Sequence, residues 1–143
     1  MRIWLLWVLL AAMAAAADPL NRDSPQSSVI AFLQAYRSKD YQRASRYLDL
    51  RKLPANQRSK EGAELARRLG QVLENNTRFD EAALSQKADG DRGTVASFTA
   101  GGTTLEVQLE HVTLRPGVSI WLFPAETVDL IPSLARLAKA ILR

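Results

Sequence analysis

The sequence contains no cysteine and a single histidine, His111. Without cysteine the chain can form no disulfide, no thiolate nucleophile and no cysteine-based metal site. One histidine excludes the usual metal sites that combine several histidines. Glycine-rich phosphate-binding loops and the Gly-x-Ser-x-Gly nucleophile motif are also missing. We therefore expect no metal, no cofactor and no enzymatic activity.

Length and composition indicate one ordinary globular domain. The chain has 143 residues, 47% of them hydrophobic and 24% charged, with a formal net charge of +4. This length accommodates at most one modest domain. The positive charge is mild, and no basic segment is interleaved with aromatic residues, so we expect no nucleic-acid partner.

The N-terminus has the pattern of a secretory signal peptide. Arg2 precedes an uncharged, mostly apolar run over residues 3–17, which ends in three alanines before Asp18. A positive start, an apolar middle and small residues at the end are typical of a cleaved leader. The run is shorter than the roughly 20 residues that a spanning helix needs. We expect a signal peptide at 1–17, cleavage after Ala17 and a mature periplasmic domain at 18–143; an uncleaved anchor is the alternative.

Helical patterns fill the first half of the mature chain. A short polar leader at 18–23 precedes Ser24 and Pro25, which predict a helix start with serine as the N-cap and proline at the first position. The apolar stripe of this helix is expected at Val29, Ile30, Leu33 and Tyr36. A third helix is expected over residues 56–75.

A second, short helix is expected between these two. Asp40 can cap it, and its apolar positions are expected at Tyr41, Ala44, Tyr47 and Leu48. Tyrosines at helical spacing could form a cluster that stacks on a ligand. We interpret them instead as residues at the core edge whose hydroxyl groups contact water.

The second half changes to strand periodicity. Segments 94–98, 104–114 and 118–123 alternate or run apolar, with glycine-rich or Pro-Gly turns between them. In the middle segment Leu105, Val107 and Leu109 are expected on the core face. After Pro124 the apolar spacing becomes helical through Leu142. The predicted class is α+β: three helices followed by a small antiparallel sheet and a C-terminal helix.

The candidate chemical groups do not form a recognisable site. Glu106 and Glu110 share one face of a strand but lie about 13 Å apart along it, which is too far for a paired carboxylate site. His111 has no nucleophile in a recognisable motif, so we interpret it as structural. Asp89 and Asp91 resemble the start of a calcium loop, but the acidic residue that should complete the loop is missing.

The order of helices followed by an antiparallel sheet permits a cone-like fold, as in the ketosteroid-isomerase and scytalone-dehydratase group. Such folds often enclose a pocket, so a periplasmic small-molecule-binding protein is the alternative function. The Asp/His pairs of those enzymes are not evident here, and the comparison is one of fold class alone.

Charge is distributed unevenly along the chain. Residues 37–68 hold 10 Lys and Arg against 4 Asp and Glu, whereas residues 69–131 hold 4 against 9. Such an asymmetry could orient a domain at a membrane surface or between subunits. Two independently solvated faces are the simpler interpretation.

Three stretches together resemble one known family. They are Asp-Pro-Leu-Asn-Arg-Asp-Ser-Pro at 18–25, the segment 40–54 with its Tyr47-Leu48-Asp-Leu-Arg core, and the segment 120–132 with Trp121, Phe123, Glu-Thr-Val and Pro132. The chain resembles the N-terminal extracytoplasmic domain of bacterial MscS-type mechanosensitive ion channels. None of these motif residues is catalytic. We interpret Trp121 and Phe123 as core anchors, Glu126 as a helix-start residue, Pro132 as a fixed bend, and Tyr47 and Leu48 as structural.

This resemblance implies a non-enzymatic, membrane-associated role. Channels of this family continue into apolar spans and a pore-lining helix, which the chain as given, ending at Arg143, does not contain. We therefore expect either the truncated leading part of a channel, which we favour, or a stand-alone module. The implied partners are membrane-embedded channel subunits, the inner-membrane surface or further copies of the same chain.

Overall fold

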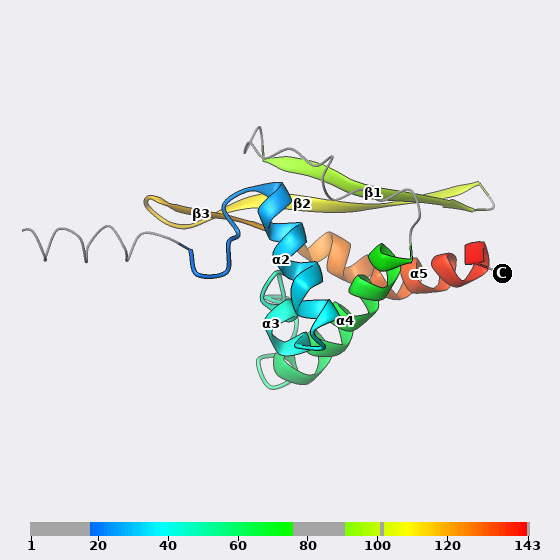
Figure 1. Cartoon of the computed structure of the whole chain (residues 1–143), viewed down its shortest axis with the longest axis horizontal. Coiled ribbons are helices and arrows are strands. Elements are labelled where there is room, and N and C mark those ends of the chain that lie inside the picture. Colours follow the sequence, from blue (N-terminus) through cyan, green and yellow to red (C-terminus); the bar gives the residue numbers. More distant parts are fainter. Residues whose placement is uncertain (1–17, 76–90, 101, 143) are drawn as a thin grey trace, which may run out of the picture.

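The described residues form two layers, in which helices cover one face of a small sheet (Figure 1). The computed structural model describes residues 18–75, 91–100 and 102–142. The elements in chain order are α2 (Pro25–Arg37), α3 (Tyr41–Ser45), α4 (Arg58–Glu74), β1 (Arg92–Ala100), β2 (Thr103–Arg115), β3 (Val118–Leu122) and α5 (Ala125–Leu142). The predicted α+β class, with its order of helices, sheet and C-terminal helix, is confirmed. The predicted leader at 1–17 lies outside the described residues.

Helix α2 begins as the sequence predicts. The Ser24 hydroxyl accepts a hydrogen bond from the Ser27 amide, and Ser27 completes a capping box with Pro25 at the first helical position. The buried face is rotated from the predicted stripe. Val29, Phe32 and Leu33 are at most 1% exposed, whereas Ile30 and Tyr36 are only half-buried.

The second helix is shorter than predicted. Asp40 caps it as expected, because its carboxylate accepts from the Arg43 amide. Helix α3 nevertheless ends at Ser45, so the prediction that it carries Tyr47 and Leu48 is wrong. Tyr47 lies in the turn that follows, and Leu48 forms an isolated parallel bridge with Phe123 of the chain leaving β3.

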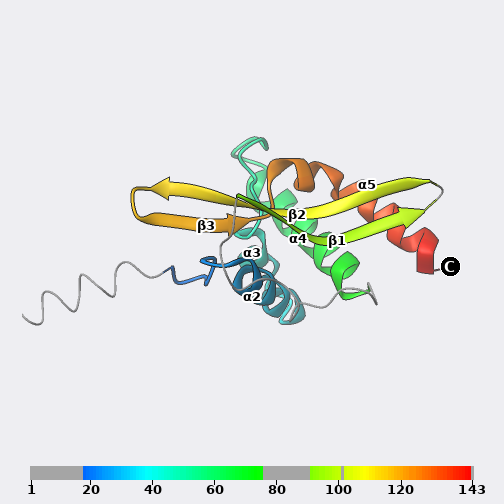
Figure 2. The same ribbon diagram turned by 90° about the horizontal axis from the view of Figure 1, so that it is seen from above.

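The sheet is antiparallel and three-stranded, in the order β1-β2-β3. Its strands fall at the predicted places, and β1 and β2 extend beyond the predicted ends. A bulge lies between Thr94 and Ala96, and the register of β2 with β3 shifts between Thr113 and Arg115. Seen from above, the β2–β3 hairpin extends beyond the helices on one side (Figure 2). Leu114, near its tip, is 57% exposed.

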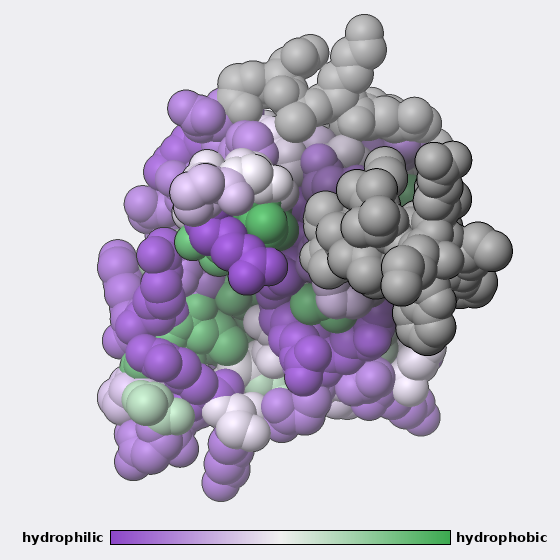
Figure 3. All heavy atoms as spheres, turned by 90° about the vertical axis from the view of Figure 1, so that its left-hand side faces the viewer, coloured by the Kyte–Doolittle hydropathy of each residue, from purple (hydrophilic) through white to green (hydrophobic). Residues whose placement is uncertain are grey.

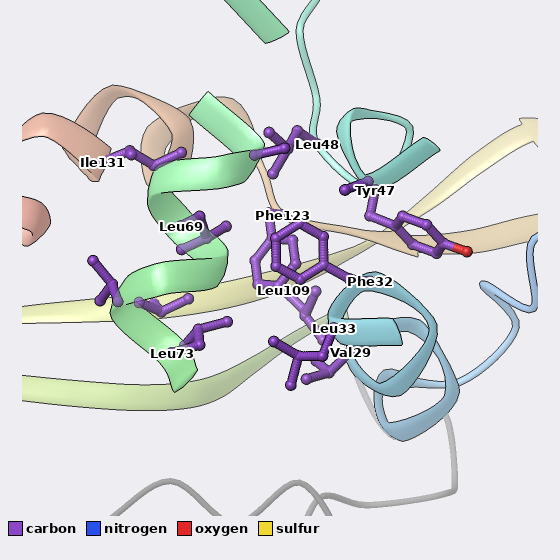
Figure 4. Close-up of a cluster of buried hydrophobic side chains, with 14 of the residues drawn as sticks. Val29, Phe32, Leu33, Tyr47, Leu48, Leu69, Leu73, Leu109, Phe123 and Ile131 are labelled. Carbon is purple, nitrogen blue, oxygen red and sulfur yellow. The ribbon is translucent and has the colours of Figure 1, made fainter. Parts of the chain in front are cut away.

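The core lies between the sheet and the helices (Figure 4). Phe32 of α2 packs edge-on against Phe123, with ring centroids 5.1 Å apart. Leu69 and Leu73 of α4, Leu109 of β2 and Ile131 of α5 complete the labelled cluster. Burying side chains of this size contributes about 1.5–3 kcal/mol each, so this cluster is the main source of stability.

Helix α5 starts directly after the sheet. Glu126 lies in its first turn and Pro132 lies inside it. Val128, Ile131 and Leu134 face the core. No helix in the described part of the chain is long and apolar enough to cross a membrane.

Candidate functional site

The seam between β3 and α5 is bonded to the helical half of the chain. The Phe123 amide donates to the Tyr47 carbonyl oxygen at 2.8 Å, and the Asp49 amide donates to the Phe123 carbonyl oxygen at 2.8 Å. Phe123 is fully buried and Leu48 is 5% exposed. The two sequence motifs that carry the family resemblance, at 40–54 and 120–132, are therefore in direct contact.

A second set of hydrogen bonds lies two residues earlier in the chain, at Trp121 of β3. The Trp121 amide donates to the Arg22 carbonyl oxygen at 2.6 Å, and the Ser28 hydroxyl donates to the Trp121 carbonyl oxygen at 3.1 Å. The N-terminal segment was expected to be a polar leader, but it packs against the sheet. Leu20 is only 7% exposed, and the Asp18 carboxylate is bonded to the Arg22 guanidinium.

Tyr47 differs from the expectation that the tyrosine hydroxyls contact water. Its side chain is fully buried, and its hydroxyl donates to the Leu20 carbonyl oxygen at 2.8 Å. In Figure 4 the hydroxyl points away from the apolar cluster, toward the N-terminal segment. Burial raises the pKa of this phenol above its usual value. Tyr47 is thus a buried structural link, whereas Tyr36 and Tyr41 are half-buried.

His111 stacks on Trp121 across the β2–β3 ladder, with ring centroids 4.9 Å apart and an interplanar angle of 12°. Trp121 is 1% exposed, and its indole Nε1 has no hydrogen-bond partner. An N–H group buried in this way carries an uncompensated desolvation cost. The stack is a packing contact, and in the described part of the chain no nucleophile or carboxylate side chain is bonded to the imidazole.

Most carboxylates of the described residues are engaged in structural contacts. Glu106 accepts from the Gln108 amide group, and Glu110 faces Arg92 at 3.7 Å. Asp49 is the buried carboxylate, and the Arg51 side chain, by its hydrogen bonds, holds the pKa of Asp49 below its usual value. No group of three or more potential metal ligands is found in the described ranges, and Asp89 lies outside them.

The most distinctive surface of the described chain is a basic end formed around α3. We define the basic end as residues 37–60, which include α3 and the first turn of α4. This segment holds two aspartates, Asp40 and Asp49, and eight cations. The eight are Arg37, Lys39, Arg43, Arg46, Arg51, Lys52, Arg58 and Lys60. Hydrogen bonding of Gln42 to the Ser59 carbonyl oxygen holds the two parts of the segment together at 3.0 Å.

Some cations of the basic end have structural roles. Arg51 binds Asp49, Arg37 binds Glu74, and the Arg58 guanidinium donates to the carbonyl oxygens of Leu53 and Arg51. Further along α4, Arg67 and Arg68 are both bound to Glu64. Hydrogen bonds from these arginines, led by Arg67, lower the pKa of Glu64 to about 2.

Other cations of the basic end are directed to solvent. Lys39, Arg46 and Lys60 are exposed, and they contact no carboxylate among the ion pairs of the described chain. In Figure 3 hydrophilic side chains predominate in the lower part of the face, with apolar residues visible between them, at the level where Figure 1 places α3 and the start of α4. Of the exposed acidic residues, Glu106, Glu126 and Asp129 belong to β2 and α5, whereas Asp40 lies in the basic end and others lie further along α4. The charge asymmetry of the sequence is therefore also an asymmetry of the fold.

The residues singled out from the sequence occupy different environments. Trp121, Phe123, Tyr47 and Leu48 lie in the core, Glu126 is exposed in the first turn of α5, and Pro132 is exposed inside that helix. Sequence reasoning missed Ser28 and Thr127, two buried hydroxyls that bond main-chain atoms of the sheet. The one sequence signal for each is that a polar residue stands inside the apolar stripe of a helix.

Comparisons of the chain with models of known protein families, with curated proteins and with solved structures found no match. The likeness to MscS-type channel domains therefore stays a prediction from the sequence motifs.

Proposed function

We propose that this chain is a non-enzymatic, extracytoplasmic contact domain of the kind found ahead of the membrane helices in MscS-type mechanosensitive channels. Its basic end would face an anionic membrane surface. The observation that carries the proposal is the set of exposed cations around α3, Lys39, Arg46 and Lys60, that contact no carboxylate in the described chain, whereas Lys52 faces Asp129 of α5 at 3.8 Å. Near an anionic membrane each Lys or Arg contributes about 1 kcal/mol of attraction, which is enough to orient a small domain.

The buried polar groups support a structural rather than a catalytic interpretation. Ser28, Ser45 and Thr127 donate to main-chain oxygens, and Asp49 is bonded to Arg51. A small-molecule-binding cone fold would instead need polar groups directed into a cavity between the sheet and the helices. In the described chain that region holds apolar side chains in mutual contact (Figure 4).

The proposal also includes export through the predicted leader. The exported protein should begin at Asp18, because the small residues before it suit signal peptidase. Intact-mass measurement of the protein from the periplasmic fraction tests this. A mass that retains residues 1–17 would support the anchored alternative.

Sedimentation with lipid vesicles tests the contact function. The full chain, expressed with its leader and purified after export, should sediment with anionic vesicles at low salt and be released as salt rises, because exposed charges are screened. Zwitterionic vesicles should bind little protein at any salt concentration. Binding that is indifferent to salt, or no binding, would contradict the proposal.

A thermal-shift screen against apolar metabolites tests the alternative function. We expect no reproducible stabilisation, since the described interior is filled by side chains. A shift of several degrees with one ligand would favour a small-molecule-binding protein, since binding to the native state raises its stability.

A further inference from the structure

The two edges of the sheet differ in how their main-chain groups are satisfied. On the outer edge of β3, Trp121 is bonded to Arg22 and Ser28, and Phe123 is bonded to Tyr47 and Asp49. Where β3 has ended, the Thr127 hydroxyl contacts both the amide and the carbonyl oxygen of Gln108, at 3.3 and 3.4 Å, on the newly exposed edge of β2. The structure thus covers this side of the sheet at Gln108, Trp121 and Phe123.

The outer edge of β1 has no such cover in the described part of the chain. β1 pairs with β2 alone, and no hydrogen bond from another described element reaches its outer side. Natural edge strands are usually protected by charged residues, prolines or bulges. β1 has a bulge near its start, but residues 93–100 contain neither a charged residue nor a proline.

The register identifies the groups that face outward. Ala100 pairs with Thr103 across a two-residue turn, so this closing pair exchanges main-chain hydrogen bonds. Bonded and non-bonded pairs alternate along an antiparallel ladder. Ser97 and Thr99 therefore direct their amides and carbonyl oxygens away from β2. The 3.0 Å contact between the Thr99 and Thr104 hydroxyls agrees with a non-bonded pair, in which opposite side chains are close.

We propose that this edge binds a second copy of the chain, by antiparallel pairing of β1 with the β1 strand of the partner. Ser97 of each copy lies opposite the partner's Thr99, and these two residue pairs together form about four main-chain hydrogen bonds between the copies. Two-fold pairing places the two Arg92 residues, the charged residues of β1, at opposite ends of the joint, so like charges do not meet. The two sheets then become one continuous sheet.

The covered edge of β3 limits the assembly to two copies. Head-to-tail contacts between copies produce rings or filaments. They would need β1 of one copy to pair with a second open sheet edge on the next copy. Arg22, Ser28, Tyr47 and Asp49 occupy the edge of β3, so strand addition closes at the dimer. This dimer interface lies on β1, whereas the basic end lies around α3, so a failure of membrane binding would not affect this inference.

The test is the molar mass of the exported full chain, measured by sedimentation equilibrium. The protein concentration is raised to about 1 mM, at which even a weakly associating dimer is substantially populated. We expect a mass that rises toward about twice the monomer value. Ser97→Pro removes the amide that faces away from β2 and leaves the hydrogen bonds to β2 in place, and edge strands tolerate proline at such positions. This variant should be a monomer. Ser97→Ala keeps the amide and should dimerise like the parent chain.

A monomer at every concentration, an unchanged dimer of a folded Ser97→Pro variant, or growth beyond two copies would each overturn the proposal. Amide hydrogen exchange of the parent chain provides a readout that does not depend on the proline variant folding. Protection of the Ser97 and Thr99 amides should rise with protein concentration. Protection that is already complete in a dilute monomer would mean that another segment of the same chain occupies the edge.

Discussion

Ser28 and Trp121 are 93 residues apart in the sequence, and the Ser28 hydroxyl donates a buried hydrogen bond to the Trp121 carbonyl oxygen at 3.1 Å. The bond joins α2 to the edge of β3. It supplies a donor to the Trp121 carbonyl oxygen where the sheet meets α2. This link explains why a serine stands among the apolar residues on the inner face of α2.

Replacing Ser28 with alanine should therefore destabilise the domain. The substitution leaves the Trp121 carbonyl oxygen buried without this donor, at a cost of about 1–3 kcal/mol. Urea denaturation of the two proteins measures the difference. Ser38→Ala, at the exposed end of the same helix, is the matched control and should change stability by less than about 0.5 kcal/mol. Equal effects of the two substitutions would mean that the buried bond contributes nothing measurable.

Two glycines of α4 should respond differently to alanine. A Cβ atom on Gly70 would collide with the ring of Tyr36, whereas a Cβ on Gly62 would meet the Cδ1 end of the Leu50 side chain at 2.6 Å. Gly70→Ala should lower stability by about 1–3 kcal/mol, because a ring packed against the helix must move. In Gly62→Ala the flexible leucine can rotate away, and the gain in helix propensity, up to about 1 kcal/mol, should offset the crowding.

Thermal unfolding of both variants measures this difference. A Gly70→Ala protein as stable as the parent would show that α2 and α4 are less closely packed around Tyr36 than the structure indicates.

The pH dependence of stability should reflect the Asp49–Arg51 pair. Hydrogen bonds from Arg51 lower the pKa of Asp49 from its ordinary value of 3.8 in the folded state. A carboxyl group with a lowered folded pKa contributes its full stability at pH values above that ordinary value, and loses it as pH falls through the folded value. Stability should therefore decline on acidification below about pH 4.

Asp49→Asn should make that decline shallower, because residue 49 would no longer take up a proton on acidification. Denaturant titrations between pH 2 and pH 6, which bracket the ordinary carboxyl range of about 4, measure the slope. Asp91→Asn, at an exposed aspartate, is the matched control. The account of this pair fails if Asp49→Asn and the parent chain decline in parallel.

The sequence predicted the elements well where local signals were strong. Ser24-Pro25 marked the start of α2 because a cap and a proline at the first position act locally. The strands followed from alternation and turn residues. The end of α3 was missed, because Tyr47 and Leu48 continue a helical spacing although the chain turns at Tyr47 and Leu48 pairs with Phe123, more than 70 residues later in the chain.

The candidate surfaces were less predictable than the fold. The sequence indicated that cations gather over residues 37–68, but it could not show that Arg67 and Arg68 are bound by Glu64 while Lys39 and Arg46 face solvent. It gave no indication that, among the described residues, one sheet edge is covered and the other is open. Such differences depend on which residues far apart in the sequence come into contact, and hydrophobic periodicity does not indicate those contacts.

The central claim, that the basic end contacts an anionic surface, is tested most directly by two variants with the same change in net charge. Lys39→Gln/Arg46→Gln removes two exposed cations beside α3, whereas Arg115→Gln/Arg136→Gln removes two exposed cations from the hairpin tip and α5. Affinity of the exported proteins for anionic vesicles at low salt is measured by co-sedimentation. At about 1 kcal/mol per cation near the membrane, the first variant should bind about 10- to 30-fold more weakly and the second within about twofold of the parent. Equal losses in both variants, or no loss in the first, would contradict the claim.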